Sequence, residues 1–224
     1  MRKYIYDTHV HTSEVSHCGR MPAAEVVRQY IDARYSGLIV TDHLSWRSYR
    51  TMSDAPWDEK VTHFLKGYDI AKQTAAALDP DFTVLLGAEL RLDCNDDNDY
   101  LLYGVDEAFL RSEPTLLQMD FEQMAACVRS HGLLLVQAHP FREDMQIMDW
   151  RLLDGVEVYN GNSSHNSNNC IADAWADRHH LLKTSGSDFH GMWGMRPGGI
   201  VTEAPVTSNA ELLEVLRGQQ YRLA

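Results

Sequence analysis

Short apolar runs alternate with segments of helical periodicity along most of the 224 residues, and this alternation constrains the fold more than any other feature. The run 133–138 (Leu-Leu-Leu-Val-Gln-Ala) has no continuous polar face, which is typical of a strand covered on both sides of a sheet. Strands separated by helices need right-handed crossovers, so the pattern favours a largely parallel sheet. The predicted strands are 3–10, 38–41, 82–90, 100–105, 133–138, 155–159, 181–187 and 199–202.

The segments between these runs carry apolar residues at helical spacing. The predicted helices are 22–37, 58–78, 114–130, 166–180 and 208–217. Strands 82–90 and 100–105 leave no room for a full helix between them, so a barrel built from these strands would be irregular. The pattern predicts one α/β domain over residues 1–224, with the strands either closed into a barrel or arranged as an open sheet.

Composition and charge indicate a globular domain and disfavour nucleic acid as a partner. Apolar residues make up 44% of the chain and charged residues 23%, which is typical of a globular domain. The formal charge of −12 repels phosphodiester backbones, so long nucleic acid is an unfavourable partner. No run of 18 apolar residues predicts a membrane span, and the first residues lack the apolar segment of a signal peptide.

The four cysteines are widely spaced, without a C-x-x-C pair, and are typical of reduced thiols in a cytoplasmic protein. They are Cys18, Cys94, Cys127 and Cys170. We therefore expect a cytoplasmic location. The sequence does not specify an oligomeric state.

Imidazoles and carboxylates gather at the C-terminal ends of the predicted strands. His9 and His11 lie two residues apart on a strand, so both rings point to the same face and can share one cation. In α/β barrels the C-terminal rim of the strands holds the active site, so residues far apart in the sequence converge there. The strand ends and the loops after them carry His9, His11, His17, His43, Glu89, His139, Asn160, Asp188 and His190.

Five short motifs resemble the signature motifs of the PHP (polymerase and histidinol phosphatase) family. The segments are 7–12 (Asp-Thr-His-Val-His-Thr), 41–43 (Thr-Asp-His), 87–89 (Gly-Ala-Glu), 138–140 (Ala-His-Pro) and 186–190 (Gly-Ser-Asp-Phe-His). They occur in the family's order and extend over about residues 5 to 202. The resemblance implies a distorted (βα)7 TIM-like barrel and a metal-dependent phosphoesterase that holds two or three cations.

The same resemblance implies a ligand set for each ion. One ion takes His9, His11, Glu89 and Asp188, the second takes His17, His43 and His190, and the third takes Glu89 and His139, with Glu89 bridging. The sequence departs from the family at one point, because no histidine lies between Glu89 and His131. Asn98 or Asp99 could replace the missing ligand, or the third cation could be weak or absent.

A ligand set of imidazoles and carboxylates suits Zn²⁺, Fe²⁺ or Mn²⁺. Paired divalent ions clamp the attacking and leaving oxygens of a phosphoryl transfer and convert a water to hydroxide near neutral pH. Glu89, Asp188 and His165 are the expected catalytic residues, with His165 as a donor to the leaving group. The expected substrate contacts are Arg142, Arg196, Asn160 and His165.

The expected reaction is hydrolysis of a small phosphomonoester, such as histidinol phosphate or a nucleotide phosphate. Two alternatives stay open from the sequence. One is an amidohydrolase-like metal hydrolase, which also carries H-x-H on its first strand. The other is a non-catalytic metal-binding PHP module of the kind that is fused to polymerases.

Overall fold

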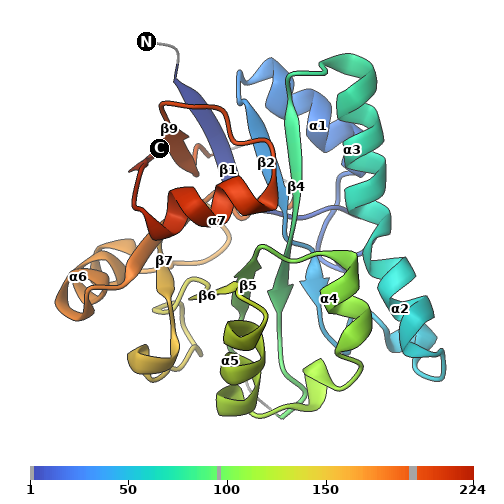
Figure 1. Cartoon of the computed structure of the whole chain (residues 1–224), viewed down its shortest axis with the longest axis vertical. Coiled ribbons are helices and arrows are strands. Elements are labelled where there is room, and N and C mark those ends of the chain that lie inside the picture. Colours follow the sequence, from blue (N-terminus) through green and yellow to red (C-terminus); the bar gives the residue numbers. More distant parts are fainter. Residues whose placement is uncertain (1–2, 95–96, 192–195) are drawn as a thin grey trace.

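The computed structural model describes residues 3–94, 97–191 and 196–224, and its strands form one sheet that curls into a nearly closed barrel (Figure 1). In chain order the strands of these residues are β1 (Tyr4–Val10), β2 (Gly37–Val40), β3 (His43–Leu44), β4 (Thr83–Leu90), β5 (Tyr100–Tyr103), β6 (Leu134–Gln137), β7 (Gly155–Asn160), β8 (Leu182–Gly186), β9 (Ile200–Thr202) and β10 (Arg222–Leu223). The helices are α1 (Ala23–Asp32), α2 (Trp57–Phe64), α3 (Lys66–Leu78), α4 (Glu107–Ser112), α5 (Phe121–Ser130), α6 (Asn169–His179) and α7 (Asn209–Arg217). Short 3₁₀ turns lie at Arg50–Met52, Leu116–Gln118 and Trp150–Leu152.

The barrel closes where the chain beyond β8 meets the end of β1. The strands follow the order β10-β9-β1-β2-β4-β5-β6-β7-β8, with β3 paired to β4. Val10 forms a parallel bridge with Phe189, and the His11 amide donates to the Phe189 carbonyl at 3.0 Å. The Thr8 hydroxyl donates to the Ser185 carbonyl at 2.9 Å. This architecture confirms the predicted α/β class and the distorted TIM-like barrel.

The prediction of a largely parallel sheet is wrong around β5 and at the C-terminal edge. Strand β5 runs antiparallel to both β4 and β6, and β9 runs antiparallel to β1 and β10. The connection between β4 and β5 is too short for a helical crossover, so the chain reverses direction there. The barrel is distorted at this point, as the short spacing in the sequence indicated.

Two predicted helices also differ from the structure. The helix expected over 58–78 is divided at Leu65 into α2 and α3. The division has a packing reason, because Phe64 of α2 joins the core under α4, whereas Ala71 of α3 packs against α1. The helix expected over 114–130 begins only at Phe121, where Asp120 and Gln123 form a reciprocal capping box.

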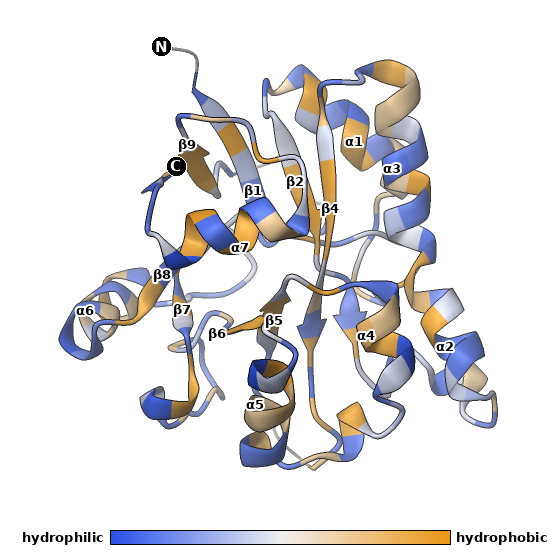
Figure 2. Cartoon of the chain, in the orientation of Figure 1, coloured by the Kyte–Doolittle hydropathy of each residue, from blue (hydrophilic) through white to orange (hydrophobic). Residues whose placement is uncertain are grey.

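Alternation along the strands separates an inner core from an outer one. In β2, Leu38 and Val40 face α1 and α3, while Ile39 lies in the barrel interior with Tyr6. Leu212 of α7 belongs to the same inner cluster, so α7 covers the end of the barrel at which the parallel strands begin. Figure 2 shows the apolar residues concentrated along the strands and on one side of the helices. The opposite end, where β1 and β4 finish, is left for polar side chains.

No helix within the described ranges is both long enough and apolar enough to cross a membrane.

The barrel closure predicts a sensitive position at Gly186. A Cβ atom on this residue would lie 2.3 Å from the His9 Cβ and 2.9 Å from Glu157 Oε1. We expect Gly186→Ala to lower the free energy of unfolding by about 1–3 kcal/mol, because overpacking forces β8 away from β1. It should also weaken metal binding, since His9 moves with β1. Thermal unfolding and metal titration of the variant measure both effects.

Gly132→Ala is the control for this substitution. A Cβ at Gly132 meets nothing within 4 Å, although its φ of +69° is unfavourable for alanine. This variant should lose about 1–2 kcal/mol from backbone strain and keep its metal affinity. Equal losses of metal affinity in the two variants would contradict the packing argument.

Candidate metal centre

The carboxylate of Glu89, at the end of β4, lies at the centre of the cluster. It is buried, and four imidazoles surround it. Its Oε1 lies 3.1 Å from His139 Nε2 and 3.3 Å from His9 Nε2. Its Oε2 lies 3.0 Å from His43 Nδ1 and 3.2 Å from His11 Nε2. Strands β1, β3, β4 and the end of β6 therefore meet at one carboxylate.

Asp188, which follows β8, supplies a second carboxylate to the same cluster. Its Oδ1 lies 3.4 Å from His9 Nε2, 3.3 Å from His11 Nε2 and 3.3 Å from His190 Nδ1. Its Oδ2 lies 3.5 Å from His165 Nε2. Asp188 has a φ of +51°, a conformation that non-glycine residues rarely adopt and that is often found at functional sites.

The hydrogen bonds of His9 and His11 fix which nitrogen of each ring faces the cluster. His9 Nδ1 donates to Glu157 Oε1 at 2.9 Å, since a carboxylate only accepts. Ser16 Oγ donates to Asp42 at 2.6 Å, so it accepts from His11 Nδ1 at 3.0 Å. Both Nε2 atoms then carry lone pairs, and they lie 3.1 Å apart. Two facing lone pairs are repulsive unless a cation or a proton lies near both.

These donors fit divalent cations. Glu89 Oε2 is buried and accepts no well-oriented hydrogen bond, although two imidazoles are close to it. His139 Nδ1 is likewise buried without a hydrogen bond. A buried carboxylate oxygen without a hydrogen bond, beside several imidazole nitrogens, is the arrangement that a divalent cation would complete. The Glu157–His9 pair has the form of the carboxylate–histidine contacts that orient metal ligands.

The charges in the cluster shift each pKa so that the charged form of the group is favoured. Burial acts to lower the pKa of His9, but the charges of Glu157, Asp188 and Glu89 outweigh it and raise that pKa well above its usual value. Burial also acts to lower the pKa of His11, but the hydrogen bonds to Asp188 and Glu89 outweigh burial and raise that pKa to about 9. Burial would raise the pKa of Glu89, yet the surrounding imidazoles lower it well below its usual value. Without cations, the carboxylates therefore hold protons on the imidazoles.

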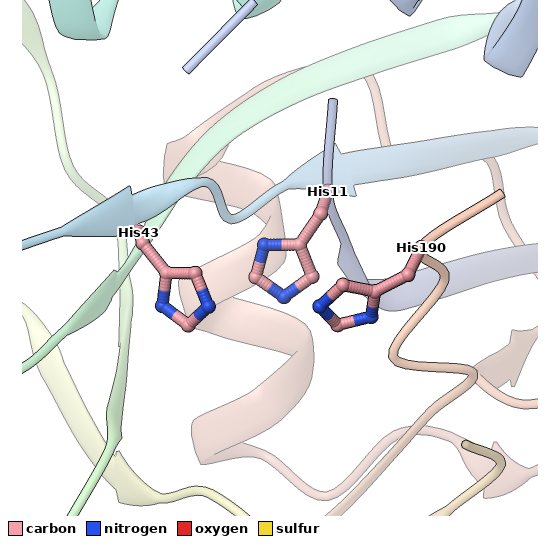
Figure 3. Close-up of side chains that lie close together, drawn as sticks. All are labelled: His11, His43 and His190. Carbon is pink, nitrogen blue, oxygen red and sulfur yellow. The ribbon is translucent and has the colours of Figure 1, made fainter. Parts of the chain in front are cut away.

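The ligand atoms form overlapping groups. His11, His43 and His190 come from three different segments, and their rings lie close together with nitrogens within 4.8 Å of one another (Figure 3). The ring centroids of His11 and His43 are 4.6 Å apart, and those of His11 and His190 are 4.4 Å apart. Two further groups of this kind are His9–His11–Glu89 and His43–Glu89–Asp99.

The position after Glu89 where the family usually supplies a histidine is occupied by Asp99. Its carboxylate is buried, with Oδ2 lying 3.9 Å from His139 Nε2. Arg91 Nε donates to its Oδ1 at 2.7 Å. Asn98 points elsewhere, because its side-chain oxygen accepts from the Gln146 amide at 2.9 Å. Of the two replacements considered from the sequence, Asp99 lies beside the imidazoles.

His17 lies at the edge of the cluster. Its ring is exposed, and its centroid is 5.7 Å from that of His43. Burial lowers the pKa of His17 from its usual value.

A pocket of about 820 Å³ opens onto the histidine–carboxylate cluster. His165 lines it, with its ring edge against His139 at a centroid distance of 5.7 Å. Asn160 is buried and donates to Glu157 Oε2 at 2.9 Å and to Asp188 Oδ2 at 3.2 Å, so it holds the two carboxylates. The positively charged side chains on the pocket wall are Arg20, Arg47, Arg91, Arg142 and Arg196.

Glu157, Cys18 and the Ser16–Asp42 pair take part in the cluster but were not singled out from the sequence. Glu157 accepts from the His9 ring, from the His139 amide at 3.0 Å and from Asn160. Its signal in the sequence is a charged residue in the middle of an otherwise apolar strand. Such a residue is expensive to bury unless it is paired.

No protein-family model matches the sequence, and no curated protein matches it. Solved structures do match, at low sequence identity. A two-domain protein from Bacteroides vulgatus contains a candidate PHP-like metal-dependent phosphoesterase. It superimposes on this chain with a TM-score of 0.72 at 16% identity. The match covers 100% of this chain and 65% of that protein, so the chain spans less than two thirds of its length.

A candidate metal-dependent phosphoesterase from Bifidobacterium adolescentis gives a TM-score of 0.59 at 17% identity and covers 95% of both chains. The chain has a PHP-like fold. An amidohydrolase from Chromobacterium violaceum, with bound sulfate and no metal, gives a TM-score of 0.57 at 18% identity. That match covers 94% of this chain and 96% of the amidohydrolase. The PHP-like barrel places the histidine–carboxylate cluster at the C-terminal rim, where barrels carry their active sites.

Substitution of Glu157 tests whether a residue that only orients the candidate metal ligands affects metal affinity. All three groups that contact its carboxylate are donors, so either orientation of a glutamine amide would place its NH₂ against one of them. We expect Glu157→Gln to weaken metal affinity by about 10–100-fold, the usual effect of removing an outer partner of a ligating histidine. Isothermal titration with Zn²⁺ or Mn²⁺ measures this change.

Glu122→Gln is the matched control, because Glu122 is exposed on α5 and the substitution removes the same charge. It should leave metal affinity unchanged. A similar weakening in both variants would point to a general effect of charge and would contradict the role of Glu157.

Proposed function

We propose that this chain is a metal-dependent phosphoesterase that hydrolyses a small phosphorylated metabolite with two or three bound divalent ions. The observation that carries the proposal is the convergence of imidazoles on Glu89 and Asp188 beneath an arginine-lined pocket. Zn²⁺, Fe²⁺ or Mn²⁺ at this position would polarise phosphoryl oxygens and lower the pKa of a water. Two solved structures with the same fold support this reading, one named for a PHP-like metal-dependent phosphoesterase and one for a metal-dependent phosphoesterase.

The proposed ligands follow the groups described above. His9, His11, Glu89 and Asp188 would hold one ion. His43 and His190 would hold a second ion, with His17 as the further ligand that the family motif implies. Glu89 and His139 would hold a third, with Asp99 in place of the missing histidine. Arg91 neutralises part of the charge of Asp99, so this third ion would be the weakest.

The pocket supports a small anionic substrate. Its volume of about 820 Å³ lies within the range of ligand sites in enzymes. Five arginines line it although the chain as a whole carries a charge of −12. Arg142 and Arg196 would each offer two parallel N–H groups to phosphate oxygens. The acidic remainder of the surface disfavours a long nucleic acid as the natural substrate.

His165 would protonate the leaving oxygen. Its Nε2 is buried without a hydrogen bond, lies 3.5 Å from Asp188 Oδ2 and belongs to a residue of the pocket wall. Its Nδ1 lies 3.1 Å from the Ser167 hydroxyl, which fixes the ring. Asp188 would hold a proton on the ring until the phosphoryl bond breaks.

A phosphate-release screen tests the proposal. Protein reconstituted with Mn²⁺, Fe²⁺ or Zn²⁺ should release phosphate from at least one of histidinol phosphate, nucleoside monophosphates and sugar phosphates. A parallel assay of amide hydrolysis covers the amidohydrolase alternative, which the fold match to a named amidohydrolase favours. Activity on amides alone would replace the proposal. Bound metal without any turnover over the panel would favour the non-catalytic module.

Acid should remove the activity through loss of metal. His9, His11 and His43 must be neutral to bind a cation, and the nearby carboxylates raise the pKa of each ring although burial opposes this. A raised pKa means that protons compete with the metal at a higher pH than for a free imidazole. We therefore expect kcat/KM to begin to fall above the pH at which a free imidazole titrates, about 6.5, and to fall steeply below about pH 6, with more than one proton involved.

The measurement is kcat/KM from pH 5 to pH 9, with metal content determined at each pH. His165→Asn serves as the comparison, because its role in the proposed site is proton donation rather than ligation. It should lower kcat and flatten an alkaline decline while keeping the acid loss of metal. Full activity at pH 5 in fully metallated enzyme would contradict the hydroxide chemistry.

A further inference from the structure

The thiol of Cys18 lies inside the histidine cluster. Its Sγ is 3.1 Å from His190 Nε2, and the thiol also interacts with the His43 ring. His190 Nδ1 donates to the Asp188 carbonyl at 2.8 Å, so the Nε2 that faces the sulfur carries a lone pair. Neither the proposed ligand sets nor the proposed substrate contacts include this thiol.

The loop that carries Cys18 is fixed at both ends. The Gly19 amide donates to the Ser16 carbonyl, and the Arg20 amide donates to the His190 carbonyl, each at 2.9 Å. Ser16 is itself bound to Asp42 through its hydroxyl. The sulfur is therefore held next to His190 by the backbone, while the neighbouring ring of His17 is exposed.

A second observation points to a ligand at this position. Glu89 Oε2 is buried without a well-oriented hydrogen bond and lies 3.0 Å from His43 Nδ1. The thiol, the two imidazoles and this oxygen are four donors of the types that zinc binds. Three of them come from residues that the proposed function already assigns to metal ions.

We infer that Cys18 is a thiolate ligand of the cation held by His43 and His190. The inference rests on the proposed metal centre and specifies the donor set of one of its ions. On binding, the S–H bond loses its proton to solvent and the sulfur forms a bond to the cation. A thiolate is a soft donor, so this position would select Zn²⁺ over Mn²⁺, while the oxygen- and nitrogen-rich remainder stays less selective.

Spectroscopy of the reconstituted protein tests the inference without an activity assay. The Co²⁺-loaded protein should show a near-ultraviolet thiolate-to-cobalt charge-transfer band. X-ray absorption of the Zn²⁺-loaded protein should contain a sulfur shell at about 2.3 Å beside nitrogen and oxygen at about 2.0–2.1 Å. The second measurement uses the unaltered chain, so it stands even if a variant fails to fold.

Three serine variants assign the sulfur. Cys18→Ser should lose the band. Cys127→Ser and Cys170→Ser should keep it, and Cys127 is the essential comparison because it lies in a surface group with Glu113 and His131. His17→Asn should also keep the band, since the sulfur and not this ring produces it.

Each contrary result has a distinct meaning. Normal metal content without a band or a sulfur shell would overturn the assignment of Cys18 and leave the proposed metal centre intact. Loss of the band in Cys127→Ser but not in Cys18→Ser would also overturn it. Failure of the unaltered protein to take up any metal would refute the proposed metal centre and the inference together.

Discussion

Burial of negative charge at the C-terminal rim is the constraint on which the rest of the structure depends. Glu89, Asp188 and Glu157 are all removed from water and can remain ionised only if positive charge or strong donors surround them. The imidazoles provide this as protonated rings, and bound cations would provide it more fully. Strand ends from the whole barrel therefore have to meet at one point, which explains why closure between β1 and β8 coincides with the densest part of the cluster.

Much of the fold and of the cluster could be predicted from the sequence because parallel strands end at the same rim. Glu89 and His139 each follow an apolar run, and His9 and Asp188 lie at the ends of other predicted strands, so their convergence follows from topology without knowledge of any distance. The direction of β5 could not be predicted in the same way. Its short connection indicated an irregularity, but a reversed strand and a distorted parallel one have the same hydropathy.

Residues that act through position within a loop were harder to predict. His17 and Cys18 are adjacent, and no periodicity fixes which of them turns inward. The structure directs the sulfur toward His190 and leaves the imidazole exposed, because backbone hydrogen bonds set the path of the loop. Glu157 was missed for a related reason. Whether a strand residue faces the interior depends on register, and β7 shifts its register immediately after this residue.

The apolar filling of the barrel has a consequence for the order of events at the rim. Tyr6, Ile39 and Leu212 occupy the interior beneath the cluster, and α7 lies across the barrel end behind them. In the proposed function, cations and substrate would therefore both approach through the arginine-lined pocket. If the proposed function holds, ions would enter before the ester, and a phosphate bound in the pocket would obstruct their departure. The protein would exchange its metals in the free state and retain them during turnover.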